Sequence, residues 1–216
     1  MPRLRWPDLR NARDLGGLPT VDGGRIRERA LIRTDNHGRL VPAGIDAIRS
    51  YGVTRVIDLR WGWEAAKYPS PLAGDERYRL IPACFDPTGD EEIPPDSYRL
   101  MADTSRGRLA AALTAVAEAP PGGVVLHCHA GRDRTGLVAA LALHVAGVAV
   151  ESIAADYALT ENSPPEMMVN TFAHLQARYG GVDEYLVGCG LAPGQLAGIR
   201  ARLTEAAGGS PSALSR

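Results

Sequence analysis

Lysine is almost absent from this chain of 216 residues: Lys67 is the only one, and arginine supplies the remaining basic side chains. The 24 basic and 25 acidic residues nearly cancel, which leaves a formal net charge of −1. Proteins that bind nucleic acid or an anionic membrane surface usually carry an excess of positive charge. The charge balance therefore indicates neither kind of partner.

Long hydrophobic runs are also missing. The longest apolar stretches lie near residues 137–150 and are too short and too interrupted to span a membrane. The first ten residues, MPRLRWPDLR, are charged, broken by proline and not followed by an apolar run. We therefore expect neither a membrane span nor a secretory signal.

Cysteine occurs three times, as Cys84, Cys128 and Cys189, and no two of these residues have the CxxC spacing. Such a pattern is neither a disulfide framework nor, by its spacing, a zinc site. Free thiols are typical of a reducing compartment, so we expect a cytoplasmic protein.

The composition that remains is that of an ordinary globular protein. Hydrophobic residues make up 45% of the chain and charged residues 23%. The length fits one domain, which we place at residues 1–206. Residues 207–216, AGGSPSALSR, are small and polar, and we expect them to form a flexible tail.

The order of predicted elements indicates an α/β fold with a mostly parallel central sheet flanked by helices, and a helical C-terminal part. The apolar runs predict strands at Ala30–Arg33, Thr54–Leu59, Tyr78–Ile81 and Val124–His127. The predicted helices are Pro42–Tyr51, one long helix at Ser97–Glu118, one from Arg134 or Thr135 onward, Glu151–Thr160, Glu166–Tyr179, Asp183–Val187 and Pro193–Glu205. Residues 164–188 either pack against the sheet or form a lid over the active site, and the pattern fits both.

One segment carries the chemistry. Residues 124–136 read VVLHCHAGRDRTG, a short apolar strand, a turn that contains glycine, and the start of a helix. This layout gathers backbone N–H groups and the positive end of the helix dipole around one small concavity, which suits a phosphate dianion. Cys128 begins the turn, and Arg134 follows six residues later.

These residue types suit attack on a phosphate ester. A helix N-terminus and a nearby cation lower the pKa of a cysteine, and the thiolate is the nucleophile. The Arg134 guanidinium can hold two phosphate oxygens, and Thr135 can donate its hydroxyl to the sulfur. We expect His127 to hold the loop in shape and Gly131 to permit its turn. The phosphate site then consists of His129, Ala130, Gly131, Arg132, Asp133 and Arg134.

The spacing of cysteine and arginine alone is a weak signal, because the chain is rich in arginine. Requiring also the preceding histidine, the glycine and the Thr-Gly pair lowers the chance of a random match to about 10⁻⁵. The alternative is a buried structural cysteine in a tight turn.

The segment HCHAGRDRTG resembles the signature loop of protein tyrosine and dual-specificity phosphatases. More narrowly, the chain resembles bacterial tyrosine/serine phosphatases, which share an NxRDLGG element (here residues 11–17), an IDLR strand end followed by glutamate (here residues 57–60 and Glu64) and a DYxLT-like segment (here residues 156–160). The resemblance implies the α/β phosphatase fold and a phosphocysteine intermediate, with neither a metal nor another cofactor. Arg132 stands where that family often has lysine.

Four aspartates are candidates for the general acid that protonates the leaving group. Asp133 is favoured by the resemblance, and its alternative role is to pair with a nearby arginine. Asp86 follows a strand at the edge where α/β proteins bind ligands. Asp58 more simply braces the loop. Asp8 completes a Trp-Pro-Asp tripeptide, but it lies 120 residues before Cys128 and reads as a turn residue.

Two further choices stay open. His129 and Arg132 either favour multiply charged substrates such as phosphoinositides or are exposed turn residues. Cys84 either forms a protective disulfide with Cys128 under oxidation or is a small core residue. The leading hypothesis is a protein phosphatase for phosphotyrosine, and also for phosphoserine and phosphothreonine. The alternatives are a phosphatase for phosphoinositides or other small esters, and a non-catalytic phosphate-binding module.

Overall fold

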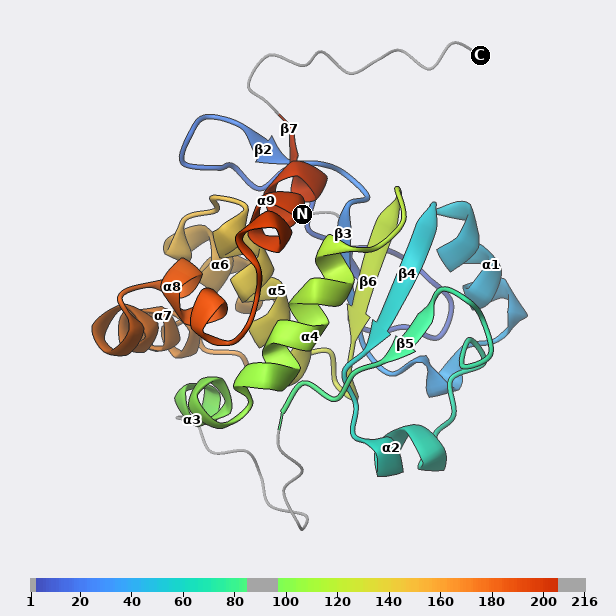
Figure 1. Ribbon diagram of the computed structural model, residues 1–216. Helices are drawn as coiled ribbons and strands as arrows, with labels where there is room; N and C mark the ends of the chain where they lie inside the picture. Colours follow the sequence, from blue (N-terminus) through green and yellow to red (C-terminus); the bar gives the residue numbers. More distant parts are fainter. Residues whose placement is uncertain (1–2, 85–96, 206–216) are drawn as a thin grey trace.

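The computed structural model describes residues 3–84 and 97–205 (Figure 1). Within these residues, five strands form the central sheet in the order β1-β3-β6-β4-β5. Four of these strands run parallel: β3 (Leu31–Thr34), β6 (Gly123–His127), β4 (Val53–Asp58) and β5 (Tyr78–Leu80). The short strand β1 (Arg13–Asp14) pairs antiparallel with β3 at one edge of the sheet. The mostly parallel α/β fold predicted above is confirmed. The expected tail, residues 207–216, lies outside the described residues.

Helices cover both faces of the sheet (Figure 1). On one face lies α1 (Pro42–Ser50), and on the other lie α4 (Arg106–Ala117), α5 (Asp133–Val145) and α9 (Pro193–Leu203). The remaining helical elements are η1 (His37–Arg39), α2 (Gly62–Lys67), α3 (Ser97–Thr104), α6 (Val150–Tyr157), α7 (Glu166–Tyr179) and α8 (Val182–Gly188).

The strands supply two cores because their side chains alternate between faces. In β6, Val124 and Leu126 join the large core under the helical layer, whereas Val125 joins the smaller core under α1. In β3, Leu31 and Ile32 divide in the same way. A sheet covered on both faces needs continuous apolar strands, and that is the pattern the sequence carries.

The single helix predicted at Ser97–Glu118 is wrong, because the chain breaks at Ser105 into α3 and α4. Ser105 has φ −112° and ψ 22°, outside helical geometry. The break lets the two halves bury different surfaces. Helix α4 packs on the sheet side against α9, while α3 turns to pack against α7.

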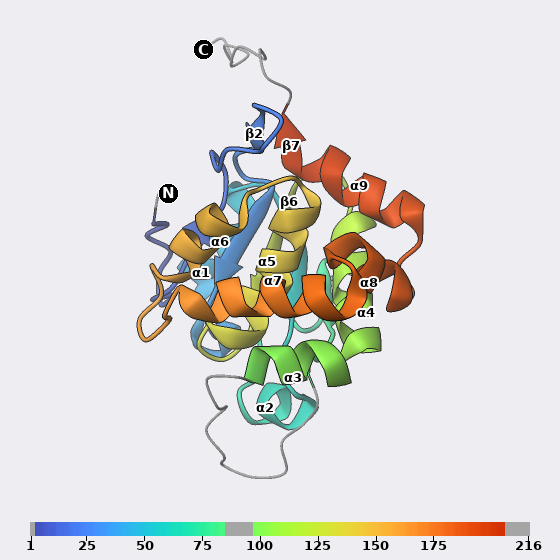
Figure 2. The ribbon, with the colours of Figure 1, turned by 90° about the vertical axis from the view of Figure 1, so that its left-hand side faces the viewer.

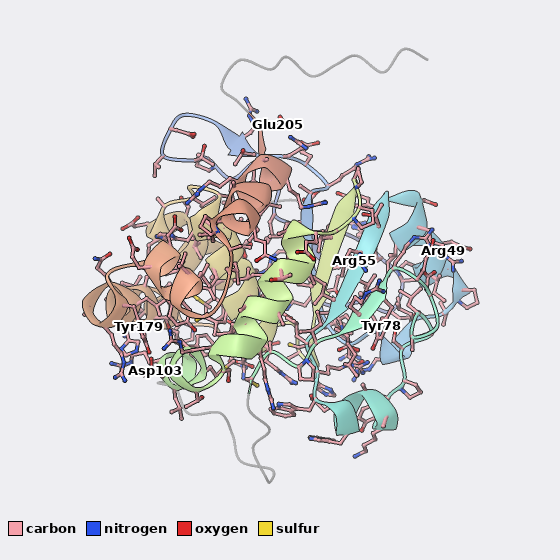
Figure 3. The ribbon with its side chains drawn as sticks, viewed as in Figure 1. Arg49, Arg55, Tyr78, Asp103, Tyr179 and Glu205 are labelled. Atoms are coloured by element: carbon pink, nitrogen blue, oxygen red, sulfur yellow. The ribbon has the colours of Figure 1, made fainter. Side chains whose placement is uncertain are left out.

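Residues 164–188 belong to the packed helical layer. Figure 2 shows α7 lying across the helical face, with α3 below it. Met168, Phe172 and Leu175 of α7 are buried in the large core. A hydrogen bond also joins α7 to α3: the hydroxyl of Tyr179 donates to Asp103 Oδ1 at 2.7 Å (both residues are labelled in Figure 3).

A second, two-stranded sheet closes the structure near the termini and has no counterpart in the sequence prediction. β2 (Arg25–Ile26) pairs antiparallel with β7 (Thr204–Glu205), so α9 ends at Leu203 rather than continuing to Glu205. Strands of two residues carry too little periodicity to be predicted. Among the described helices, none is long and apolar enough to cross a membrane.

Candidate functional site

The signature loop, residues 128–132, joins β6 to α5 at the carboxyl ends of the parallel strands. Cys128 directly follows the strand, and only 2% of its surface is exposed. Gly131 has φ +67°, a conformation that favours glycine. A Cβ at this position would lie 2.4 Å from the Thr34 carbonyl oxygen of the neighbouring strand β3. The close approach of loop and strand therefore requires glycine at position 131.

The carbonyl groups of the loop are held from outside. The backbone N–H of Asn36 donates to the His129 carbonyl at 3.0 Å. The Asn11 amide donates to the carbonyls of Ala130 and Gly131 at 3.2 and 3.3 Å, and Arg33 Nη2 donates to the Gly131 carbonyl at 2.9 Å.

Since a trans peptide unit points its C=O and the following N–H in opposite directions, outward carbonyls turn the next N–H groups inward. These are the N–H groups of Ala130, Gly131 and Arg132, and within the described residues they have no hydrogen-bond acceptor. Helix α5 begins at Asp133, directly after these amides. The sequence predicted a start at Arg134 or Thr135, so the helix begins one residue before the first of these. The loop is thus a nest of free donors in front of a helix N-terminus, which suits a small anion.

Two distant sequence elements build the support under this nest. Asp156 of α6 accepts from Arg13 Nε at 3.3 Å and from Arg33 Nη1 at 2.9 Å. Arg13 also donates to the side chains of Asn11, at 2.7 Å, and Thr160, at 2.9 Å. The residues 11–17 element and the residues 156–160 segment therefore meet beneath the loop. Arg13 holds Asn11, whose amide donates to the loop carbonyls, and Arg33 of β3 donates to the Gly131 carbonyl directly.

Arg134 lies on the first turn of α5 and is clamped by Glu64 of α2. Its Nη1 forms a close ion pair with Glu64 Oε2, and its Nη2 donates to Glu64 Oε1 at 3.0 Å. The guanidinium carbon lies 4.1 Å from the centre of the Trp61 ring. Burial by itself would lower the pKa of Arg134, but the hydrogen bonds to Glu64 and the electrostatic interaction with that carboxylate raise the pKa above its usual value.

This ion pair engages both Nη atoms of Arg134 and leaves its Nε unused. Arg134 Nε is buried and has no partner among the described residues. Glu64 is in turn oriented by the Trp61 backbone N–H, which donates to its Oε2 at 2.8 Å. Burial opposes ionisation of Glu64, but its hydrogen bond from Arg134 lowers the pKa of the carboxyl below its ordinary value. The arginine is thus fixed with a free donor for an anion.

Asp58 is the last residue of β4, beside the strand that leads into the loop. It is fully buried and accepts from Arg60 Nη2 and from the Tyr78 hydroxyl, both at 2.6 Å. Its Oδ2 lies 3.5 Å from His127 Nε2, and the His127 ring stacks on His37 with 3.8 Å between centres. Burial lowers the pKa of His127, so the ring is neutral at pH 7. Its role in holding the loop in shape stays a prediction.

Asp133 is the first residue of α5, beside the signature loop. Its Oδ1 accepts from the Tyr98 hydroxyl at 2.7 Å and from Arg132 Nε at 3.1 Å. The Tyr98 hydroxyl is also 2.5 Å from that of Tyr157, so α3 and α6 both reach this carboxylate. Asp86, the alternative acid, lies outside the described residues. Asp8 lies in a turn with φ +64°.

Two other predicted residues lie under the loop. The Thr135 hydroxyl is buried and has no hydrogen-bond partner among the described residues. Cys84 is buried in the large core, and burial raises its pKa to about 11, although Arg134 acts in the opposite direction. Its protonated thiol fits the role of a small core residue.

Some functional side chains escaped the sequence analysis. The spacing within residues 124–136 singled out Arg134, but it did not identify Trp61 as its neighbour. Nor did it identify Tyr98 as the partner of Asp133 or Arg33 as the donor to the Gly131 carbonyl. Glu64 was noted only as part of a family pattern. The signal available for it was its position three residues after Trp61, at the N-terminus of a short helix, which is where a capping carboxylate sits. In the described part of the chain, no group of three or more potential metal ligands occurs.

Comparison with known proteins agrees with this geometry. A sequence model described as the tyrosine phosphatase family matches residues 4–205. The chain is 28% identical to a tyrosine-protein phosphatase of Nostoc commune, over 87% of this chain and 79% of that protein. It is also 28% identical to the triple specificity protein phosphatase PtpB of Mycobacterium tuberculosis, over 80% of this chain and 74% of that one.

Proposed function

Because this chain belongs to the tyrosine phosphatase family, we propose that it hydrolyses phosphate monoesters on proteins through a covalent intermediate on Cys128. Phosphotyrosine is the main proposed substrate, and phosphoserine and phosphothreonine are further proposed substrates. The observation that carries the proposal is the nest of residues 128–132, whose free amides directly precede the helix that bears Arg134, an arginine with an unused Nε. This arrangement is a site for a tetrahedral dianion next to a sulfur nucleophile.

In the bound state, the amides of Ala130, Gly131 and Arg132 hold the phosphoryl oxygens, together with Nε of Arg134. Phosphoryl transfer spreads negative charge over the three equatorial oxygens, and these fixed donors stabilise that charge without reorganisation. Glu64 keeps the guanidinium in place by its double contact, so the donor is positioned before the substrate arrives.

The reaction proceeds in two steps. The Cys128 sulfur attacks phosphorus, the bond from phosphorus to the ester oxygen breaks, and Asp133 gives its proton to the departing oxygen. A water molecule then attacks the phosphocysteine, passing a proton to Asp133, and the sulfur leaves as thiolate with release of inorganic phosphate. The buried Thr135 hydroxyl, which has no other partner among the described residues, can stabilise that departing thiolate by donating a hydrogen bond to it.

Cys128 can attack phosphorus only while its sulfur is not oxidised. This requirement supports a reducing compartment, and we infer a cytoplasmic location on that ground together with the cysteine pattern.

The experiment measures hydrolysis of an aryl phosphate, phosphopeptides and phosphoinositides under reducing conditions. We expect Cys128→Ser to lose turnover and still bind inorganic tungstate, since the loop amides and Arg134 remain. Full activity in Cys128→Ser would refute the nucleophile, and a wild type that hydrolyses no ester would leave a phosphate-binding module as the function. A higher kcat/KM on phosphoinositides than on phosphopeptides would favour the alternative substrate class.

A second pair of variants tests the acid. Asp133→Asn should slow alkyl esters more than aryl esters, because an alkoxide is the poorer leaving group and depends more on the proton; the loss expected is about 10²- to 10⁴-fold. Asp86→Asn is the matched comparison. If Asp86→Asn produces this pattern and Asp133→Asn does not, the assignment is wrong.

A further inference from the structure

A basic groove begins at the signature loop and continues over the N-terminal segment. Its volume is about 1130 Å³. It is lined at one end by His129, Ala130 and Arg132 of the loop, and farther along by the arginines of the N-terminal segment and η1 together with residues of the 159–162 turn. The arginines that line the groove are Arg3, Arg5, Arg10, Arg13, Arg39 and Arg132.

Half of these six arginines are available for binding. Arg5, Arg10 and Arg39 are exposed, and within the described residues their side chains have no ion-pair or hydrogen-bond partner. Arg3 donates to the Arg10 carbonyl, and Arg13 is neutralised by Asp156. The lining therefore keeps three uncommitted guanidinium groups.

The groove carries little compensating negative charge. Its two acidic lining residues are Asp35 and Glu161. Asp35 is buried, and its Oδ1 is occupied by the backbone N–H groups of Arg10 and Asn11, at 3.0 and 3.1 Å. Those two bonds fix the segment that carries Arg5 and Arg10, because it is pinned to the end of β3.

The N-terminal segment is also anchored by packing. Trp6 and Leu9 are buried in the smaller core, and the Trp6 ring meets Tyr51 edge-on with 5.4 Å between centres. The Leu4 N–H donates to the Ala12 carbonyl at 2.9 Å. The arginines are thus displayed from a fixed wall of the groove rather than from a loose end.

We propose that this groove is a docking subsite for an anionic segment of a protein substrate, next to the phosphorylated residue bound at the signature loop. This inference rests on the proposed function. Arginine is suited to this task because its planar fork binds a carboxylate or a phosphate through two hydrogen bonds. The anions would be aspartate and glutamate side chains or a second phosphorylated residue in the same peptide.

The shape of the groove favours a peptide over a single lipid headgroup. Its volume exceeds the range of about 300–1,000 Å³ that is typical of small-molecule sites. The apolar side chains of Leu4 and Leu159 lie among the arginines, and Leu159 is 59% exposed. This mixture matches a polypeptide, which presents apolar side chains between its charged ones.

The test compares kcat/KM for phosphotyrosine peptides that differ only in their flanking residues: glutamate, glutamine, or phosphoserine. The variant is the triple substitution Arg5→Ala, Arg10→Ala, Arg39→Ala. The control variant, Arg25→Ala, Arg79→Ala, Arg178→Ala, removes the same charge at exposed arginines that do not line the groove. The readout is the ratio of the glutamate peptide to the glutamine peptide, which cancels any effect on the phosphate site itself.

We expect the wild type to prefer the glutamate peptide and the groove variant to lose that preference by about tenfold, since exposed ion pairs contribute roughly 1.4- to 5-fold each. The control variant should keep the wild-type ratio. Raising the salt concentration should reduce the ratio in the wild type, because exposed charges are screened over about 8 Å at physiological ionic strength. The phosphoserine peptide shows whether a second phosphate replaces the carboxylates.

An equal kcat/KM for the glutamate and glutamine peptides in the wild type, with hydrolysis of both, would overturn the docking subsite and leave the proposed function intact. A protein that hydrolyses none of the peptides would contradict the proposed function instead. A groove variant that loses activity on phosphoinositides and keeps its full preference among peptides would assign the groove to a lipid headgroup, and that result would also overturn the subsite.

Discussion

Glu64 is the residue whose replacement tests the architecture of the site most directly. Three donors converge on its carboxylate: the backbone N–H of Trp61 and two nitrogens of Arg134. In Glu64→Gln the shape is kept, but one carbonyl oxygen remains for these three donors, and the new NH₂ group faces another donor. The buried guanidinium of Arg134 then loses its full counter-charge.

The expected cost follows from burial. The Arg134 and Glu64 side chains are each 6% exposed. Removing one partner of a buried ion pair costs about 3–5 kcal/mol. Because glutamine retains one acceptor, we expect the lower end, about 3 kcal/mol of unfolding free energy, or roughly 6–12 °C in Tm for a chain of this size. We also expect kcat/KM to fall by about 10- to 100-fold, because the free Nε of Arg134 is no longer positioned.

The assay is urea unfolding of wild type and Glu64→Gln, with Glu76→Gln as the control at an exposed position. The control should stay within about 0.5 kcal/mol of wild type. A loss below about 1 kcal/mol in Glu64→Gln, with unchanged kcat/KM, would refute the conclusion that Glu64 holds Arg134.

The pH dependence gives an independent check. The pKa of Glu64 is lowered in the folded state from its ordinary value of 4.5. A carboxyl with a lowered folded-state pKa contributes stability that is fully present above its unfolded-state pKa and is lost as pH falls through the folded-state value. The stability difference between wild type and Glu64→Gln should therefore be full at pH 7 and shrink as the pH falls below about 4.5. A difference that stays constant down to acid denaturation would contradict this.

Two further substitutions probe the loop and the acid. Gly131→Ala should cost at least about 1–3 kcal/mol of stability and lower phosphate affinity, because the new Cβ would meet the Thr34 carbonyl in a strained backbone conformation. Thermal unfolding measures the loss of stability, and inhibition by inorganic phosphate measures the affinity. An unchanged inhibition constant would count against the tight contact of loop and strand. Tyr98→Phe removes the hydrogen bond to Asp133 and should lower kcat for alkyl esters by about 2- to 10-fold, with KM nearly unchanged. A larger change in KM than in kcat would contradict a positioning role for Tyr98.

The local elements were predictable because their signals are local. The strands at β3, β4, β5 and β6 follow from short apolar runs, and their alternation with helices indicates a parallel sheet. The place of the site follows from one segment, in which a strand, a glycine turn and a helix start occur within 13 residues. The break at Ser105 could not be predicted, because it depends on which neighbour each half of the helix packs against.

The sequence by itself determined where the proposed nucleophile and the proposed phosphate donors lie, since Cys128, the loop amides and Arg134 are close together along the chain. Tertiary structure alone decided what holds them in place. Asn11, Arg33, Glu64, Tyr98 and Asp156 come from five separate elements and meet only when the sheet and the helical layer pack together. Each of these partners is more than 20 residues from the group it contacts in the loop or its support, and no spacing rule encodes contacts at such separation.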